Sequence, residues 1–111
     1  MEHVTAVEQG VPVLRLSGRF DAFEVEPVRT WVTETINADT PSVVIDLSGV
    51  TFIDSSALAV LVKGMKACRE HDGDLHLAGL EQAVRIIFEL TRLDKAFKIY
   101  DSADEAVTAL L

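Results

Sequence analysis

Three small polar residues, Asp54, Ser55 and Ser56, stand between an apolar stretch and the start of an expected helix. The simplest chemistry for them is helix capping, in which the Asp54 or Ser55 side chain accepts hydrogen bonds from free N–H groups of the first turn, a contribution of about 0.5–2 kcal/mol. The same geometry also suits phosphorylation. A phosphate on a hydroxyl at a helix N-terminus gains N–H donors and the positive end of the helix dipole. The spacing alone leaves both interpretations open.

A phosphate on Ser55 would have a different effect on a partner protein. Phosphorylation adds about −1.5 to −2 charges, next to Asp54 in the sequence and, we expect, near Asp21 in the fold. If a partner packs over the helix start, repulsion and desolvation of this cluster would cost ~2–4 kcal/mol, which weakens binding roughly 30- to 1000-fold. One modification can thereby switch an interface off without unfolding the domain.

The same helix carries a stripe of small residues beside its expected core face. Ser56, Ala59, Val60, Lys63 and Ala67 follow helical spacing. One interpretation is that Ala59 and Val60 pack beneath neighbouring loops. The other is a docking surface that begins at the serine hydroxyl and includes the Lys63 ammonium group.

The positions of these residues in the fold depend on strands and helices that alternate along the chain. Apolar residues with a period of two, or in continuous β-branched runs, predict strands, and helical spacing predicts helices. Gly18 is expected to close the second strand, which leaves Arg19–Phe23 as a loop. The expected strands are Val4–Val7, Val11–Ser17, Val43–Leu47, Leu75–Ala78 and Phe97–Tyr100; the expected helices are Glu24–Asn37, Ser55–Glu70, Gln82–Leu90 and one that starts near Ser102 and ends with Ala106–Leu111.

This order predicts a single α/β domain over residues 1–111. Strands that alternate with helices favour a mostly parallel sheet, and the turn at Gln9 and Gly10 adds an antiparallel hairpin at its edge. About four helices are expected to pack against the sheet. The continuous apolar run in Val43–Leu47 is typical of a strand that is buried on both faces.

The composition excludes several classes of function. Eighteen acidic against ten basic residues give a net charge of −8, which repels nucleic acid and anionic membranes. The longest apolar run, Ala57–Val62, is far shorter than the ~18 residues of a membrane span, and the N-terminal residues do not predict a secretion signal. Because one cysteine allows no internal disulfide, we expect a cytoplasmic protein.

The scattered titratable residues favour packing over chemistry. Cys68 falls on the core face of its helix, and we expect it to be buried. His3, His71 and His76 lack the spacing of metal ligands. No metal or other cofactor is therefore expected, and His76 is expected at the surface of its strand.

The segment around Ser55 resembles the STAS domain family, which includes bacterial anti-sigma factor antagonists and domains of sulfate transporters. The family signature, a strand followed by Asp-Ser-Ser/Thr-Gly-Leu and a helix, matches Val43–Leu47 and Phe52–Leu58. An early Leu-x-Gly-x-x-Asp pattern matches Leu16–Asp21, and residues 73–80 are similar to the strand before the third helix. The resemblance extends over nearly the whole chain and implies a STAS-like fold.

The resemblance also implies a role for each residue of the segment. In the antagonists, the serine directly after the aspartate, here Ser55, is phosphorylated by a kinase that is also the anti-sigma factor. The unphosphorylated form binds this kinase and frees the sigma factor, and a phosphatase of the PP2C type restores it. Asp21 and Asp54 lie at family positions near the phosphorylated group, with Ser56 as its neighbour. The expected partner-binding residues are Ala57, Ala59, Val60 and Lys63.

This chain departs from the family pattern at three positions. Ala57 replaces the usual glycine, and Ala59 stands where a second glycine is common. Because alanine favours helix by ~1 kcal/mol over glycine, the helix start should be stiffer, and close backbone approach is lost there. Arg19 stands where many members have an acidic residue. These differences bear on which partner fits.

Three other functions compete with the phosphorylation switch. The first is an unmodified STAS adaptor subunit of a membrane transport or signalling complex. The second is a small enzyme or nucleotide-binding protein, although no glycine-rich phosphate loop follows a strand. The third is a response-regulator receiver, which would need paired acidic residues at the end of its first strand, where this chain has Leu14–Ser17. We therefore expect an interaction module and not an enzyme.

Overall fold

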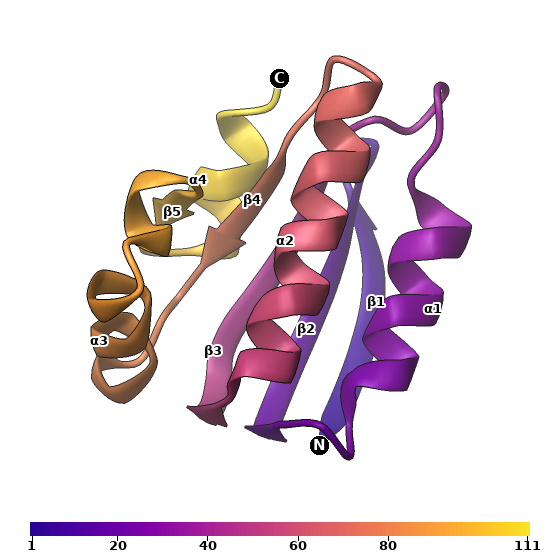
Figure 1. Ribbon diagram of the computed structural model, residues 1–111. Helices are drawn as coiled ribbons and strands as arrows, with labels where there is room; N and C mark the ends of the chain where they lie inside the picture. The colour runs from indigo at the N-terminus through magenta and orange to yellow at the C-terminus, as the bar shows by residue number, and fades with distance from the viewer.

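The computed structural model describes residues 1–111, which form one five-stranded sheet with its strands in chain order (Figure 1). β1 runs antiparallel to β2, and all the other neighbouring strands are parallel. This confirms the predicted mixed, mostly parallel sheet with an antiparallel edge hairpin. The strands are β1 (Glu2–Glu8), β2 (Val11–Phe20), β3 (Val43–Ile53), β4 (Leu75–Ala78) and β5 (Lys98–Tyr100).

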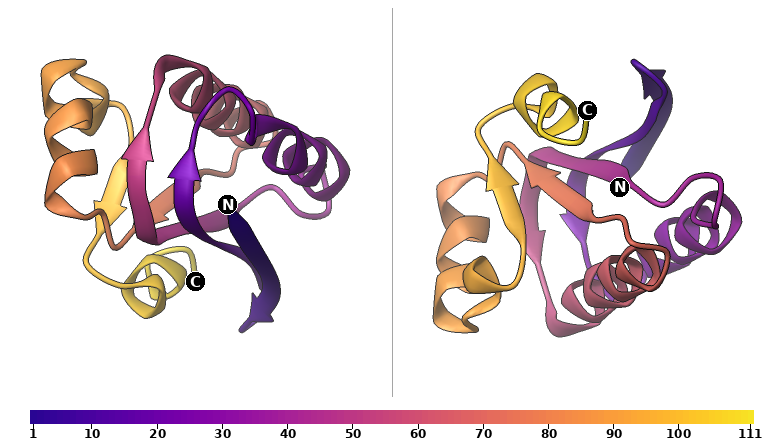
Figure 2. Two further views of the ribbon diagram at one scale, coloured as in Figure 1. Left: turned by 90° about the horizontal axis from the view of Figure 1, so that it is seen from below. Right: turned by 90° about the horizontal axis from the view of Figure 1, so that it is seen from above.

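Four helices cover the two faces of this sheet unequally (Figure 2). α1, α2 and α3 contribute to the main hydrophobic cluster on one face, whereas α4 contributes to a smaller cluster on the other. None of the helices has the length and apolar character that a membrane crossing requires. The helices are α1 (Val25–Thr35), α2 (Ser55–Glu70), α3 (Gln82–Leu90) and α4 (Ala103–Thr108), with a short 3₁₀ helix, η1, at Leu93–Lys95.

The first half of β3 is buried on both faces, as its apolar run predicts. Ile45 and Leu47 belong to the main cluster, and Val44 belongs to the cluster beneath α4. Because full burial of such side chains contributes about 1.5–3 kcal/mol each, β3 is anchored firmly in the sheet. α2 begins two residues after β3 ends, so this anchoring also positions the start of α2.

β2 is longer than predicted, and β3 continues to Ile53 through residues 48–53, for which the sequence allowed a short extension or a turn. Gly18 does not close β2: it adopts a positive φ of 96° at a register shift, and pairing resumes beyond it, with Phe20 opposite Ile53. A glycine tolerates this conformation without a steric penalty, so the strand bends but continues. The prediction was wrong because the longer β3 offers further partners, and these are not visible in the local pattern of β2.

β1 is also longer than predicted, since it covers Glu2–Glu8 and not only Val4–Val7, whereas the remaining boundaries follow the predictions closely. α2, β4 and α3 have the predicted bounds. α1 is shorter than predicted by one residue at its start and two at its end, and β5 begins one residue later, at Lys98. The last helix covers Ala103–Thr108 and not the final three residues, and η1 was not predicted.

His76 is buried, not at the surface as predicted, with 5% of its area exposed. Its Nδ1 lies 3.0 Å from the carbonyl oxygen of Ala106, and its Nε2 lies 3.7 Å from the Asp74 carboxylate. α4 packs over β4 and supplies both the cover and the hydrogen-bond partner. That contact comes from 30 residues further along the chain, beyond the reach of the strand pattern.

Cys68 is fully buried, as predicted, and this makes its reactivity testable. Burial, reinforced by the nearby Asp74 carboxylate, raises the pKa of the thiol to about 12. Because the thiolate is the nucleophile, we expect iodoacetamide at about pH 8 to alkylate the native protein more than about 100-fold more slowly than the urea-unfolded protein. Mass spectrometry over time would measure both rates, and prompt labelling of the native protein would contradict the expectation.

Candidate functional site

Asp54 joins the start of α2 to the loop that follows β2. Its Oδ1 accepts a hydrogen bond from the N–H of Ala57 at 3.0 Å, which makes Asp54 the N-cap of α2. Its Oδ2 accepts a hydrogen bond from the N–H of Ala22 at 2.9 Å, and its own N–H donates to the carbonyl of Phe20 at 3.4 Å. Of the two capping residues considered from the sequence, Asp54 caps the helix and Ser55 does not.

Asp21 lies at the same end of the sheet because Asp21 and Asp54 directly follow the paired ends of β2 and β3. The Asp21 Oδ1 accepts a hydrogen bond from the N–H of Phe23 at 3.1 Å, and its Oδ2 lies 3.6 Å from the Arg19 Nε. Asp21 therefore shapes the loop that Asp54 holds from the other side. The structure thus brings together the two acidic residues that the sequence analysis placed near Ser55.

Ser55 is the first residue of α2, and its side chain is exposed. Its hydroxyl makes no hydrogen bond within the protein, because Asp54 provides the cap. The N–H groups of Ser55 and Ser56 belong to the first turn, where a helix leaves its donors without intrahelical partners. Ser56 is half-buried. A free hydroxyl and free amide donors therefore occur together at the positive end of a 16-residue helix.

Two of the expected partner-binding residues lie in the core instead. Ala57 has 0% and Val60 3% of its area exposed, whereas Ala59 and Lys63 are exposed. The buried face of α2 is wider than predicted because it packs against α1 as well as the sheet. The docking interpretation is corrected accordingly: Ala57 and Val60 support the helix from below, and only Ala59 and Lys63 remain available to a partner.

Two exposed aromatic side chains near this end of the sheet were not singled out from the sequence. Phe23, in the loop held by Asp54, is 94% exposed, and Phe52, near the end of β3, is 38% exposed. The Arg19 guanidinium carbon lies 4.0 Å from the centre of the Phe52 ring, a cation–π contact. Large apolar side chains left in water are typical of protein interfaces. For Phe23, the sequence did offer a signal of exposure: an aromatic residue between acidic residues in a loop.

The site offers a hydroxyl that another enzyme can modify, and little chemistry of its own. A serine nucleophile needs an adjacent base, but both oxygens of the neighbouring Asp54 carboxylate already accept backbone hydrogen bonds. No group of three or more His, Cys, Asp or Glu side chains is arranged to hold a metal ion. The arrangement is suited to receiving a phosphate and to contacting a protein.

Comparisons with known proteins find relatives over almost the whole chain. The family described as "STAS domain" matches residues 3–106. The chain is 30% identical to the anti-sigma F factor antagonist of Paenibacillus polymyxa over 111 residues, which cover 99% of this chain and 92% of the relative. An anti-sigma factor antagonist from Mycobacterium paratuberculosis has a similar structure, with a TM-score of 0.87, 28% identity and coverage of 98% of this chain and 92% of the other.

A more distant structure shares the fold alone. It is the Bacillus cell fate determinant SpoIIAA, solved in its phosphorylated form. SpoIIAA has a TM-score of 0.78 and 20% identity to this chain, with coverage of 99% of this chain and 100% of SpoIIAA. The sheet order and helix positions described above are therefore kept at low sequence identity.

The role of Asp54 as a link between two elements can be tested by its removal. Asp54→Ala deletes the cap of α2 and the acceptor for the Ala22 N–H, so we expect a loss of about 1–2 kcal/mol in the free energy of unfolding. The matched control is Asp39→Ala, because the Asp39 side chain is exposed and accepts no hydrogen bond. Urea unfolding followed by circular dichroism measures both variants. Equal stabilities would show that the Asp54 bonds contribute nothing.

Proposed function

Because this chain belongs to the STAS domain family and matches its anti-sigma factor antagonists, we propose that phosphorylation of Ser55 controls its binding to an anti-sigma factor. In this proposal the anti-sigma factor is also the serine kinase. The unmodified chain binds it and thereby frees the sigma factor for transcription. The phosphorylated chain is released, and a phosphatase of the PP2C type returns it to the binding form.

The exposed, unbonded hydroxyl of Ser55 at the first position of α2 carries this proposal. The oxygen of a capping serine is already engaged with the backbone, but here Asp54 holds the cap and Ser55 is free. A phosphate on Ser55 can accept hydrogen bonds from the first-turn N–H groups and is stabilised by the helix dipole, at about 0.3–1 kcal/mol for an exposed site. The domain therefore accepts the phosphate without rearrangement of its core.

The same phosphate disfavours the binding of a partner. The modified Ser55 adds about −1.5 to −2 charges next to the Asp54 carboxylate, at the end of the sheet where Asp21 also lies. A partner that covers this end must desolvate all of these charges together. A cost of ~2–4 kcal/mol weakens the complex roughly 30- to 1000-fold.

The exposed residues around Ser55 supply the contacts that this partner requires. Phe23 offers a large apolar side chain, and Ala59 and Lys63 continue the exposed surface along α2. Interfaces concentrate their affinity in a few aromatic and basic side chains. Support also comes from the relatives: the P. polymyxa protein is an anti-sigma F factor antagonist, and SpoIIAA has been solved in a phosphorylated form.

The assignment of Ser55 is tested by phosphorylation with the host's anti-sigma factor kinase and ATP. We expect intact-protein mass spectrometry to show one added phosphate on the wild type and on Ser56→Ala, and none on Ser55→Ala. Ser56 is the matched control because it is adjacent, carries the same hydroxyl and is half-buried. Modification of Ser55→Ala would exclude Ser55 as the acceptor. If the wild type stays unmodified and remains tightly bound to the anti-sigma factor when ATP is added, this result would favour the STAS adaptor alternative.

A further inference from the structure

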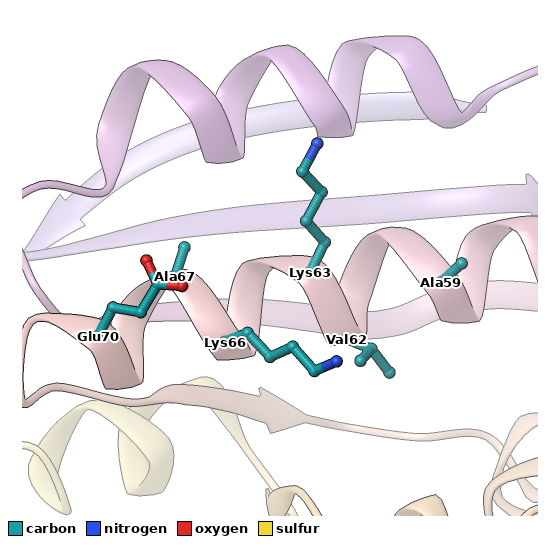
Figure 3. A pocket seen from close by; sticks show the side chains of 6 residues that line it. All are labelled: Ala59, Val62, Lys63, Lys66, Ala67 and Glu70. Carbon is teal, nitrogen blue, oxygen red and sulfur yellow. The ribbon is translucent and has the colours of Figure 1, made fainter.

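The outward side of α2 holds a shallow groove of about 390 Å³ (Figure 3). Its floor contains small and apolar side chains, Ala59, Val62 and Ala67, so the backbone of another helix can approach closely. The distance between packed helices, about 8–10 Å, depends on the size of such side chains. The groove is lined by Ala59, Val62, Lys63, Lys66, Ala67 and Glu70.

Two lysines give this groove a charge opposite to that of the protein. Lys63 and Lys66 extend to opposite sides of the helix axis, and neither forms an ion pair in the structure (Figure 3). α2 has three basic residues, with Arg69 paired to Asp74, and one acidic residue, Glu70. In a chain with a net charge of −8, α2 is thus a locally basic element.

We propose that this groove receives an acidic helix of the anti-sigma factor. Carboxylates on the partner helix would lie against Lys63 and Lys66, and small or apolar residues between them would contact the alanine floor. Glu70, at the C-terminal end of the groove, attracts a basic residue and so selects one direction for the docked helix. This inference rests on the proposed function and adds the chemistry of the partner surface.

Other occupants fit the charges less well. A second copy that packed its α2 against this one would bring three basic residues and one acidic residue to a surface of the same composition, so like charges would outnumber opposite ones. Nucleic acid would contact two lysines but meet a protein of net charge −8 around them. An acidic protein helix satisfies both lysines and the small floor.

The groove and Ser55 are far enough apart along α2 to act separately in binding. Lys63 is eight residues beyond Ser55, which corresponds to about 12 Å along the helix axis. This exceeds the Debye length of about 8 Å at physiological salt, so the charge of a phosphate on Ser55 is largely screened at Lys63 and Lys66. The lysines therefore govern partner choice and association rate, and the phosphate governs release.

The first test measures binding of the purified anti-sigma factor to a double charge reversal, Lys63→Glu with Lys66→Glu. We expect affinity to fall at least about tenfold, mainly through slower association, with the difference shrinking as salt concentration rises. The matched control is Lys95→Glu with Lys98→Glu, an equal change in charge at two exposed lysines that do not line the groove. Circular dichroism verifies that both variants are folded. Equal affinity of the two double variants at low salt would overturn the proposal that the groove binds the anti-sigma factor.

The second test uses a probe that does not depend on the anti-sigma factor. An alanine-based helical peptide with glutamate at every fourth position is titrated into ¹⁵N-labelled protein. We expect amide shifts at Ala59, Lys66 and Ala67 in the wild type, and none in the Lys63→Glu, Lys66→Glu variant or with a lysine version of the peptide. Shifts elsewhere, or equal shifts with both peptides, would overturn the inference. Failure of the proposed function is seen separately, as a Ser55 hydroxyl that the kinase leaves unmodified.

Discussion

The carboxylate of Asp54 holds the functional end of this protein together. One oxygen caps α2 and the other accepts a hydrogen bond from the N–H of Ala22 in the loop after β2. Two segments separated by more than 30 residues thereby meet at one side chain. This link fixes the start of α2 and the loop that carries Phe23 relative to each other, in addition to the anchoring of β3 and the loop bonds of Asp21.

The same interaction leaves Ser55 free. A serine at the N-cap of a helix has its hydroxyl oxygen engaged with the backbone. Here an aspartate one residue earlier performs that role, so the serine occupies the first helical position with an exposed hydroxyl. The fold combines a stable helix end with a chemically available group, and it keeps two carboxylates near any charge that is added there. An interface over this end is therefore sensitive to one phosphate, while the core beneath it is not.

The two sides of α2 have different roles: the inward side stabilises the fold, and the outward side is available for recognition. Ala57, Val60 and the other inward residues pack against the sheet and α1, which ties the helix rigidly to the core. Ala59, Lys63 and Lys66 face outward, where substitution changes the surface and leaves the packing intact. A rigid helix loses little conformational entropy when a partner docks. The alanine at position 57 contributes to this rigidity, because alanine favours helix over glycine.

The sequence by itself determined the elements with strong local periodicity and the residue types at the end of β3. α2, α3 and β4 have the predicted bounds, because helical spacing and continuous apolar runs report directly on which face is buried. The Asp-Ser-Ser order likewise limited the cap to Asp54 or Ser55. Only the tertiary structure decided between those two, extended β2 beyond Gly18, buried His76 beneath α4, moved Ala57 and Val60 into the core and left Phe23 in water. The choice of cap depends on the backbone geometry at the start of α2. The others depend on partners 30 or so residues away or on which face of an element a neighbour covers, and such contacts leave no periodic pattern in the local sequence.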